Sequence, residues 1–115
     1  MRVLIVDDHP SFRASARKLL ESEGYEVVGE AANGAEALAA AEELHPVVVL
    51  LDIQLPDIDG CEVAARLGKH EDPPEVILTS SRDAGDYGEC IDNCGARGFV
   101  PKAELSGAVL TTLLA

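Results

Sequence analysis

The sequence predicts an α/β protein, a doubly wound parallel sheet with helices on both faces. Short apolar runs alternate with segments of helical character along the 115 residues, so that a βα unit is repeated five times. The runs at 3–6 and 47–51 are continuously apolar, which is typical of strands that are covered on both faces. A chain of this length is expected to form one domain.

Five strands are expected where β-branched residues and leucine cluster. They span about residues 2–7, 26–31, 47–51, 75–79 and 97–100. Apolar stripes at helical spacing predict the helices that follow the first three strands: Phe12, Ala16 and Leu19; Ala37, Ala41 and Leu44; and Val63 with Leu67. Each stripe is expected to face the sheet.

Helix starts are marked by Pro10 in a first turn, by Asn33 with Glu36 as a capping box, and by Asp59 and Asp83 as N-caps. The segment 80–96 is the weakest expected helix, because interior glycines each cost about 1 kcal/mol relative to alanine. The last helix is expected from Glu104 to Ala115.

The charge of the chain argues against two classes of partner. The formal net charge is −12, and such a surface repels nucleic-acid backbones and anionic lipid headgroups. No apolar stretch approaches the length of a membrane span, and Asp7 interrupts the first apolar run too early for a signal peptide. We therefore expect a cytoplasmic protein that binds neither nucleic acid nor membrane directly.

The three cysteines are Cys61, Cys90 and Cys94. The last two lie one helical turn apart, a spacing of about 5–6 Å that is too wide for a disulfide. A zinc site would need further soft ligands at matching spacing. We expect three reduced, mostly packed thiols, with redox sensing as the alternative.

Three acids follow apolar runs, namely Asp7 and Asp8 after the first and Asp52 after the third. The carboxyl ends of parallel strands meet at one edge, so these acids are expected to converge there. Two carboxylates 4 Å apart repel by about 4 kcal/mol at an effective dielectric near 20. A cation is therefore expected between them, and Mg²⁺ prefers such oxygen ligands.

Lys102 and Thr79 follow the fifth and fourth expected strands and can reach the same edge. A carboxylate nucleophile, a divalent ion, an ammonium group and a hydroxyl suit the acceptance of a phosphoryl group. Asp52 is the expected nucleophile, because it stands alone after a central strand.

Four ordered segments resemble the receiver domain of bacterial response regulators in two-component systems, over essentially the whole chain. They are Val6-Asp7-Asp8-His9-Pro10, Leu51-Asp52-Ile53-Gln54-Leu55-Pro56-Asp57-Ile58-Asp59-Gly60, Leu78-Thr79-Ser80 and Gly95-Ala96-Arg97-Gly98-Phe99-Val100-Pro101-Lys102. The resemblance implies a flavodoxin-like fold with a parallel five-stranded sheet in the order 2-1-3-4-5. The Asp-Asp-His-Pro and Pro-Lys-Ala-Glu-Leu stretches resemble the NarL/LuxR branch.

The resemblance also implies a role for each site residue. Asp52 would take a phosphoryl group from a sensor histidine kinase, and Thr79 and Lys102 would contact it. Asp7, Asp8, Asp52 and the backbone carbonyl of Gln54 would hold Mg²⁺. Thr79 and Phe99 would switch a face made by the fourth helix, fifth strand and fifth helix, which would pair with an effector or form a homodimer.

The implied protein is a signalling switch that turns over no external substrate. Residues 1–115 would be the receiver domain of a transcription regulator, whose helix-turn-helix output domain is absent from this chain. Departures from the commonest family pattern are Ala103 after Lys102, Ser80 in place of a smaller residue, and Phe99 in place of Tyr. None of them removes a required group.

Other interpretations remain open at this point. Asp7 and Asp8 alone suit a helix N-terminus, and Asp52 alone suits a solvated loop. A flavodoxin-like cofactor binder would want a phosphate loop in place of Asp-Asp-His-Pro, and an aspartyl phosphatase would want an acid where Gln54 stands. A receiver-like interaction module that works without phosphorylation is the main alternative.

Overall fold

The computed structural model describes residues 1–80 and 95–114. Its elements, in chain order, are β1 (Arg2–Val6), α1 (Pro10–Ser22), β2 (Glu26–Ala31), α2 (Gly34–Leu44), β3 (Val48–Asp52), α3 (Gly60–Leu67), β4 (Glu75–Ser80), β5 (Gly98–Pro101), the 3₁₀ turn η2 (Lys102–Glu104) and α5 (Gly107–Leu114). The strands form one parallel sheet in the order β2-β1-β3-β4-β5. The predicted fold class and strand order are therefore confirmed.

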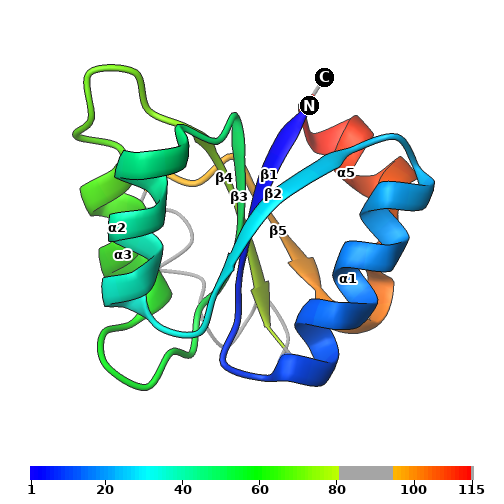
Figure 1. Ribbon diagram of the computed structural model, residues 1–115, viewed down its shortest axis with the longest axis horizontal. Coiled ribbons are helices and arrows are strands. Elements are labelled where there is room, and N and C mark those ends of the chain that lie inside the picture. Colours follow the sequence, from blue (N-terminus) through cyan, green and yellow to red (C-terminus); the bar gives the residue numbers. More distant parts are fainter. Residues whose placement is uncertain (81–94, 115) are drawn as a thin grey trace.

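Helices cover both faces of the sheet, α1 and α5 on one and α2 and α3 on the other (Figure 1). Successive side chains of a strand point to opposite faces, so the continuous apolar runs fill two cores at once. Leu4, Leu51 and Leu67 belong to the core under α2 and α3. Ile5 and Leu110 belong to the core under α1 and α5.

The helix starts agree with the sequence at three of the four marked positions. Pro10 opens α1, and the side chains of Asn33 and Asp59 accept hydrogen bonds from N–H groups in the first turns of α2 and α3. Glu36 reaches back to the N–H of Ala32 at 3.0 Å, one residue further than a standard capping box. Asp83 lies outside the described residues, as does most of the helix expected over 80–96.

Two helical predictions need correction. Leu20 is fully buried and Leu19 only half-buried, so the stripe of α1 continues from Ala16 by four residues and not by three. The last helix begins at Gly107 and not at Glu104, because Lys102–Glu104 forms a separate 3₁₀ turn. The hydroxyl of Ser106 then accepts the N–H of Val109 at 3.1 Å and caps the start of α5.

The expectation of three reduced thiols is wrong at Cys61, which is disulfide-bonded and partly buried at the start of α3. Cys90 and Cys94 lie outside the described residues.

No helix in residues 1–80 and 95–114 combines the length and the apolar character that a membrane crossing requires.

Candidate functional site

The predicted site residues lie together at the carboxyl edge of the sheet. Asp7 directly follows β1, Asp52 ends β3, Thr79 lies beside Asp52 in the parallel register of β4, and Lys102 follows β5. Apolar strands carry these groups to the rim, since the strand residues directly before Asp7, Asp52 and Thr79 are buried. The strand order places β1, β3 and β4 side by side, which is why residues distant in sequence meet here.

Lys102 joins the two buried acids. Its Nζ lies 2.6 Å from Oδ2 of Asp7 and 3.1 Å from Oδ2 of Asp52. Lys102 thus forms an ion pair with both carboxylates and donates a hydrogen bond to Asp52. The ring of Phe12 lies 4.6 Å from Nζ on the α1 side and holds the ammonium by a cation–π contact.

Burial and partners act in opposite directions on the pKa of each group. Burial raises the pKa of Asp52, an effect that the N–H of Gln54 and the charge of Lys102 only partly oppose. Burial alone would lower the pKa of Lys102, but its contacts with Asp7 and Asp52 raise it above the usual value. The ammonium is therefore firmly charged, while Asp52 is a carboxylate made more basic by its surroundings.

A second group of atoms at the site is suited to a metal ion. Asp7, Asp8, His9 and Asp52 each offer one ligand atom, and these atoms all lie within 4.8 Å of one another. Asp7 is fully buried, whereas the side chain of Asp8 is 36% exposed and opens the cluster to solvent. Gln54 lies in the turn after β3, where its N–H bonds Oδ1 of Asp52 at 3.0 Å.

Thr79 lies on β4 and Phe99 on β5, the two strands on the side of β3 that faces away from β1. The Thr79 hydroxyl is buried and has no hydrogen-bond partner among the described residues. An unsatisfied buried hydroxyl is costly, so this group fits a polar ligand at the site. Phe99 is half-buried in β5, pairs in register with Leu78 and packs against the core under α2 and α3.

Asp57 organises the loop after β3, a role that its place in the sequence does not indicate. Its carboxylate accepts the N–H groups of Gly34 and Ala35, at 2.8 and 2.9 Å, at the start of α2. These hydrogen bonds lower the pKa of Asp57. The loop that carries Gln54 is thereby fixed to α2. The residues around Asp57 are typical of a turn, but the N–H groups that Asp57 binds lie more than twenty residues earlier in the sequence.

Gly60 lets the start of α3 pack closely against the backbone at the end of β3. A β-carbon at this position would lie 2.4 Å from the backbone oxygen of Asp52 and 2.6 Å from Cα of Ile53. The start of α3 therefore packs directly on the backbone that carries Asp52, and only glycine allows this approach.

This arrangement is that of a known family. The chain matches the response regulator receiver domain over residues 3–114, and it belongs to that family. Among solved structures, it is similar to the signal receiver domain of the response regulator NarL from Mycobacterium tuberculosis, with a TM-score of 0.87, 38% identity, and coverage of 99% of this chain and 96% of that one. A DNA-binding response regulator of the LuxR family from Staphylococcus aureus aligns with a TM-score of 0.88 at 26% identity, over 98% of this chain and 95% of that one.

Relatives by sequence are NarL/LuxR-type regulators. The transcription regulator BvgA of Bordetella pertussis is 44% identical over 90% of this chain and 49% of its own length. The transcriptional activator EvgA of Escherichia coli is 34% identical over 90% of this chain and 51% of its own length. The chain thus spans about half the length of these relatives.

Proposed function

We propose that this chain is the phosphoacceptor domain of a response regulator and that Asp52 accepts a phosphoryl group from a sensor histidine kinase. The P–N bond of the donor phosphohistidine breaks and a P–O bond to the Asp52 carboxylate forms. The observation that carries the proposal is the grouping of three groups at one edge of the sheet: Asp52, the Lys102 ammonium, and the buried Thr79 hydroxyl, which has no hydrogen-bond partner among the described residues.

The chain's own groups suit this reaction. Asp52 is held by the N–H of Gln54 and by Lys102, so its carboxylate is fixed before a donor arrives. Lys102 and the Thr79 hydroxyl can each supply a hydrogen bond to phosphoryl oxygens, on which charge is spread in the transition state. The proposed domain, residues 1–115, is expected to turn over no external substrate, because Gln54 stands two residues after Asp52, where an aspartyl phosphatase would have its general acid.

Asp7, Asp8, Asp52 and the backbone carbonyl of Gln54 are the groups that would hold Mg²⁺. The donor set fits the ion, because hard carboxylate oxygens converge in one cluster whose ligand atoms lie within 4.8 Å of one another. When bound, Mg²⁺ neutralises carboxylate charge and orients phosphoryl oxygens.

Output is proposed to pass through β5 and α5. Thr79 would move toward the phosphoryl group and Phe99 would follow it, which favours one of two arrangements of this face. A shallow groove on α5 lined by Ala108, Val109, Thr112 and Leu113 offers apolar surface for a second subunit or an effector. Because BvgA and EvgA are transcription regulators, the controlled output is proposed to be transcription in the cytoplasm, through a DNA-binding domain and not through this acidic chain.

The test is the intact mass of the protein after incubation with acetyl phosphate, with and without Mg²⁺. We expect a Mg²⁺-dependent gain of one phosphoryl group that is lost in Asp52→Asn. Asp72→Asn is the matched control, because it makes the same change of charge at an exposed position in the loop before β4 and should keep the gain. A folded parent protein that binds Mg²⁺ but gains no mass would contradict the proposal and favour an interaction module that works without phosphorylation.

A further inference from the structure

Arg13 on α1 contacts the main chain of the proposed metal site. Its Nη1 donates to the backbone carbonyl of Asp7 at 2.5 Å, and its side chain is only 17% exposed. That carbonyl belongs to the peptide group that joins Asp7 to Asp8. Because a peptide group is planar, holding its carbonyl restricts the backbone rotations on either side of it. Arg13 therefore acts on the directions of both carboxylates through the main chain that carries them.

A carboxylate on β2 holds the guanidinium in place. Nε of Arg13 donates to Oε1 of Glu30 at 3.2 Å, and Glu30 pairs in register with Ile5 of β1. The guanidinium is planar and presents its donors in a fixed geometry, so the contact with Glu30 helps to direct Nη1 toward the Asp7 carbonyl. The N–H of Asp7 donates to the carbonyl of Ala31 at 3.0 Å. The main chain of Asp7 is thus held at its N–H by β2 and at its carbonyl by α1.

Arg17 lies one turn further along α1 and pairs with the same carboxylate. Its Nε lies 2.7 Å from Oε2 of Glu30, and its Nη1 donates to the backbone carbonyl of Val27 in β2. Arg17 therefore already joins α1 to β2 through Glu30. The feature that sets Arg13 apart is its hydrogen bond to the Asp7 carbonyl, which the attachment of α1 to β2 does not require.

We propose that Arg13 is a positioning residue for Mg²⁺: through the Asp7 carbonyl, it holds the carboxylates of Asp7 and Asp8 in the arrangement that binds the ion. This inference rests on the proposed function, since it concerns the same metal site. Groups that orient metal ligands typically change metal affinity by about 10–100-fold when they are removed. Charge alone predicts the opposite sign, because a cation near the site repels Mg²⁺ and its removal would tighten binding.

The experiment measures Mg²⁺ affinity by calorimetry for the parent protein, Arg13→Met and Arg17→Met. Both variants remove one positive charge beside Glu30, but only Arg13→Met removes the hydrogen bond to the Asp7 carbonyl. Arg13→Met should bind Mg²⁺ about tenfold more weakly than Arg17→Met, which should stay within about twofold of the parent protein. The Mg²⁺ concentration that half-saturates phosphorylation by acetyl phosphate should rise by the same factor in Arg13→Met, with a smaller effect on the rate at saturating Mg²⁺.

Arg13→Lys decides the question if Arg13→Met does not fold. It keeps the charge, but a single ammonium group lacks the fixed fork that reaches Glu30 and the Asp7 carbonyl together, so Mg²⁺ binding should still weaken. Equal Mg²⁺ affinities of Arg13→Met and Arg17→Met would overturn the inference, as would tighter binding in Arg13→Met. If Arg13→Lys is the only folded variant of Arg13, an affinity equal to that of the parent protein would overturn it.

The parent protein separates this inference from the proposed function. If the Mg²⁺ affinity does not depend on Arg13 but the parent protein is phosphorylated in a Mg²⁺-dependent way, the proposed function stands and the role of Arg13 is wrong. If the parent protein binds Mg²⁺ but gains no phosphoryl group, the proposed function fails, and the comparison of affinities still decides the role of Arg13. A parent protein that binds no Mg²⁺ would overturn the role of Arg13 as well.

Discussion

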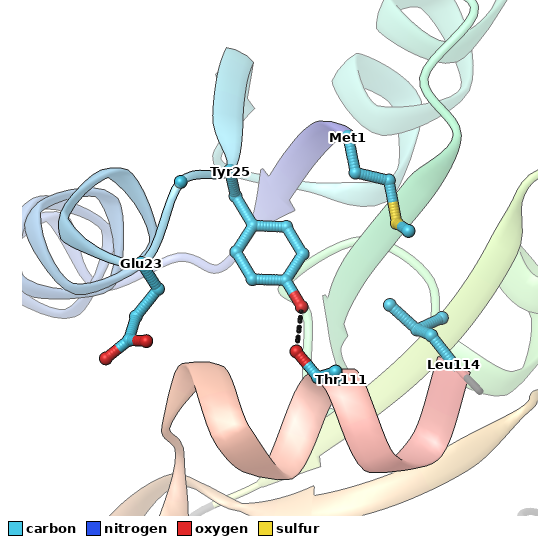
Figure 2. Close-up of a pocket in the computed structure, with 6 residues that line it drawn as sticks. Met1, Glu23, Tyr25, Thr111 and Leu114 are labelled. Atoms are coloured by element: carbon cyan, nitrogen blue, oxygen red, sulfur yellow. Dashed lines mark hydrogen bonds between the residues drawn. The ribbon is translucent and has the colours of Figure 1, made fainter.

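The two edges of the sheet differ in what they bury. The buried polar or charged residues of the described chain are Asp7, Asp52, Thr79 and Ser80, and all four lie at the carboxyl ends of β1, β3 and β4. The amino edge instead holds a cavity of about 320 Å³ lined by Met1, Glu23, Gly24, Tyr25, Thr111 and Leu114 (Figure 2). Its polar contact is a hydrogen bond of 2.8 Å between the hydroxyls of Tyr25 and Thr111, both in reach of solvent.

This difference indicates that the carboxyl edge is shaped by function and the amino edge by the stability of the fold. Burying an acid without full compensation costs free energy, and strongly perturbed titratable groups concentrate at functional sites. At the carboxyl edge, Asp52 keeps a raised pKa although Lys102 and Gln54 contact it. At the amino edge, the polar groups that line the cavity reach solvent, so the free-energy cost of burying them is small. Mutations at the two edges should therefore affect different properties.

The largest expected effect comes from Gly60→Ala. The added β-carbon would meet the backbone of Asp52 and Ile53, which cannot rotate away as a side chain can. Overpacking of this kind costs about 1–3 kcal/mol, which outweighs the gain of up to about 1 kcal/mol from replacing glycine in a helix. We expect a lower free energy of unfolding by urea denaturation, and a lower yield of phosphorylated protein because Asp52 is displaced.

Gly68→Ala is the matched control for this prediction. Gly68 follows α3 at the other end, where a β-carbon would meet only ordinary contacts at 3.5 Å. The same chemical change should leave stability within about 0.5 kcal/mol and phosphorylation unchanged. If Gly60→Ala behaved like Gly68→Ala, the close packing of α3 on the strand that carries Asp52 would matter neither for stability nor for phosphorylation.

Asp52→Asn is expected to stabilise the metal-free protein at neutral pH. Burial raises the pKa of Asp52, so between the ordinary value and the raised one the folded chain binds more protons than the unfolded chain. Stability from this group is therefore complete below the unfolded pKa of 3.8 and is lost as pH rises through the raised pKa. Asparagine does not titrate, so its advantage should grow over that range and then level off.

The measurement is urea unfolding of both proteins in EDTA across a series of pH values. A difference in stability that is constant with pH, or that shrinks as pH rises, would contradict a raised pKa at Asp52. Mg²⁺ should reverse the comparison, because an ion that binds only the folded state stabilises the parent protein more than the variant.

The sequence was sufficient to predict the fold and the convergence of the acids, because both follow from local patterns. Continuous apolar runs identify the strands, and the geometry of parallel sheets brings their carboxyl ends together. The prediction that Leu19 faces the sheet is wrong. Residues three and four positions after Ala16 both suit the buried face of a helix, and the packing of the fold buries Leu20.

What the sequence could not predict depends on contacts between distant segments. The hydrogen bonds of Asp57 to the start of α2 and the packing of Gly60 on Asp52 follow from how three elements meet. The disulfide at Cys61 was not predicted either, because the sequence carries no signal that this cysteine is paired.

The smallest expected effect is that of Tyr25→Phe at the amino edge. The hydroxyl of Thr111 donates to the carbonyl of Gly107 at 2.9 Å, so the Tyr25 hydroxyl must donate in the bond that joins them. Removing this exposed donor should lower the free energy of unfolding by no more than about 0.5–1 kcal/mol and leave the yield of phosphorylated protein unchanged.

Tyr25→Ala should cost more stability, because the ring packs against the core under α1 and α5, yet it too should keep the yield of phosphorylated protein. If either variant changed the yield at equal folded protein, the amino edge would be coupled to Asp52, and the separation of the two edges would be wrong.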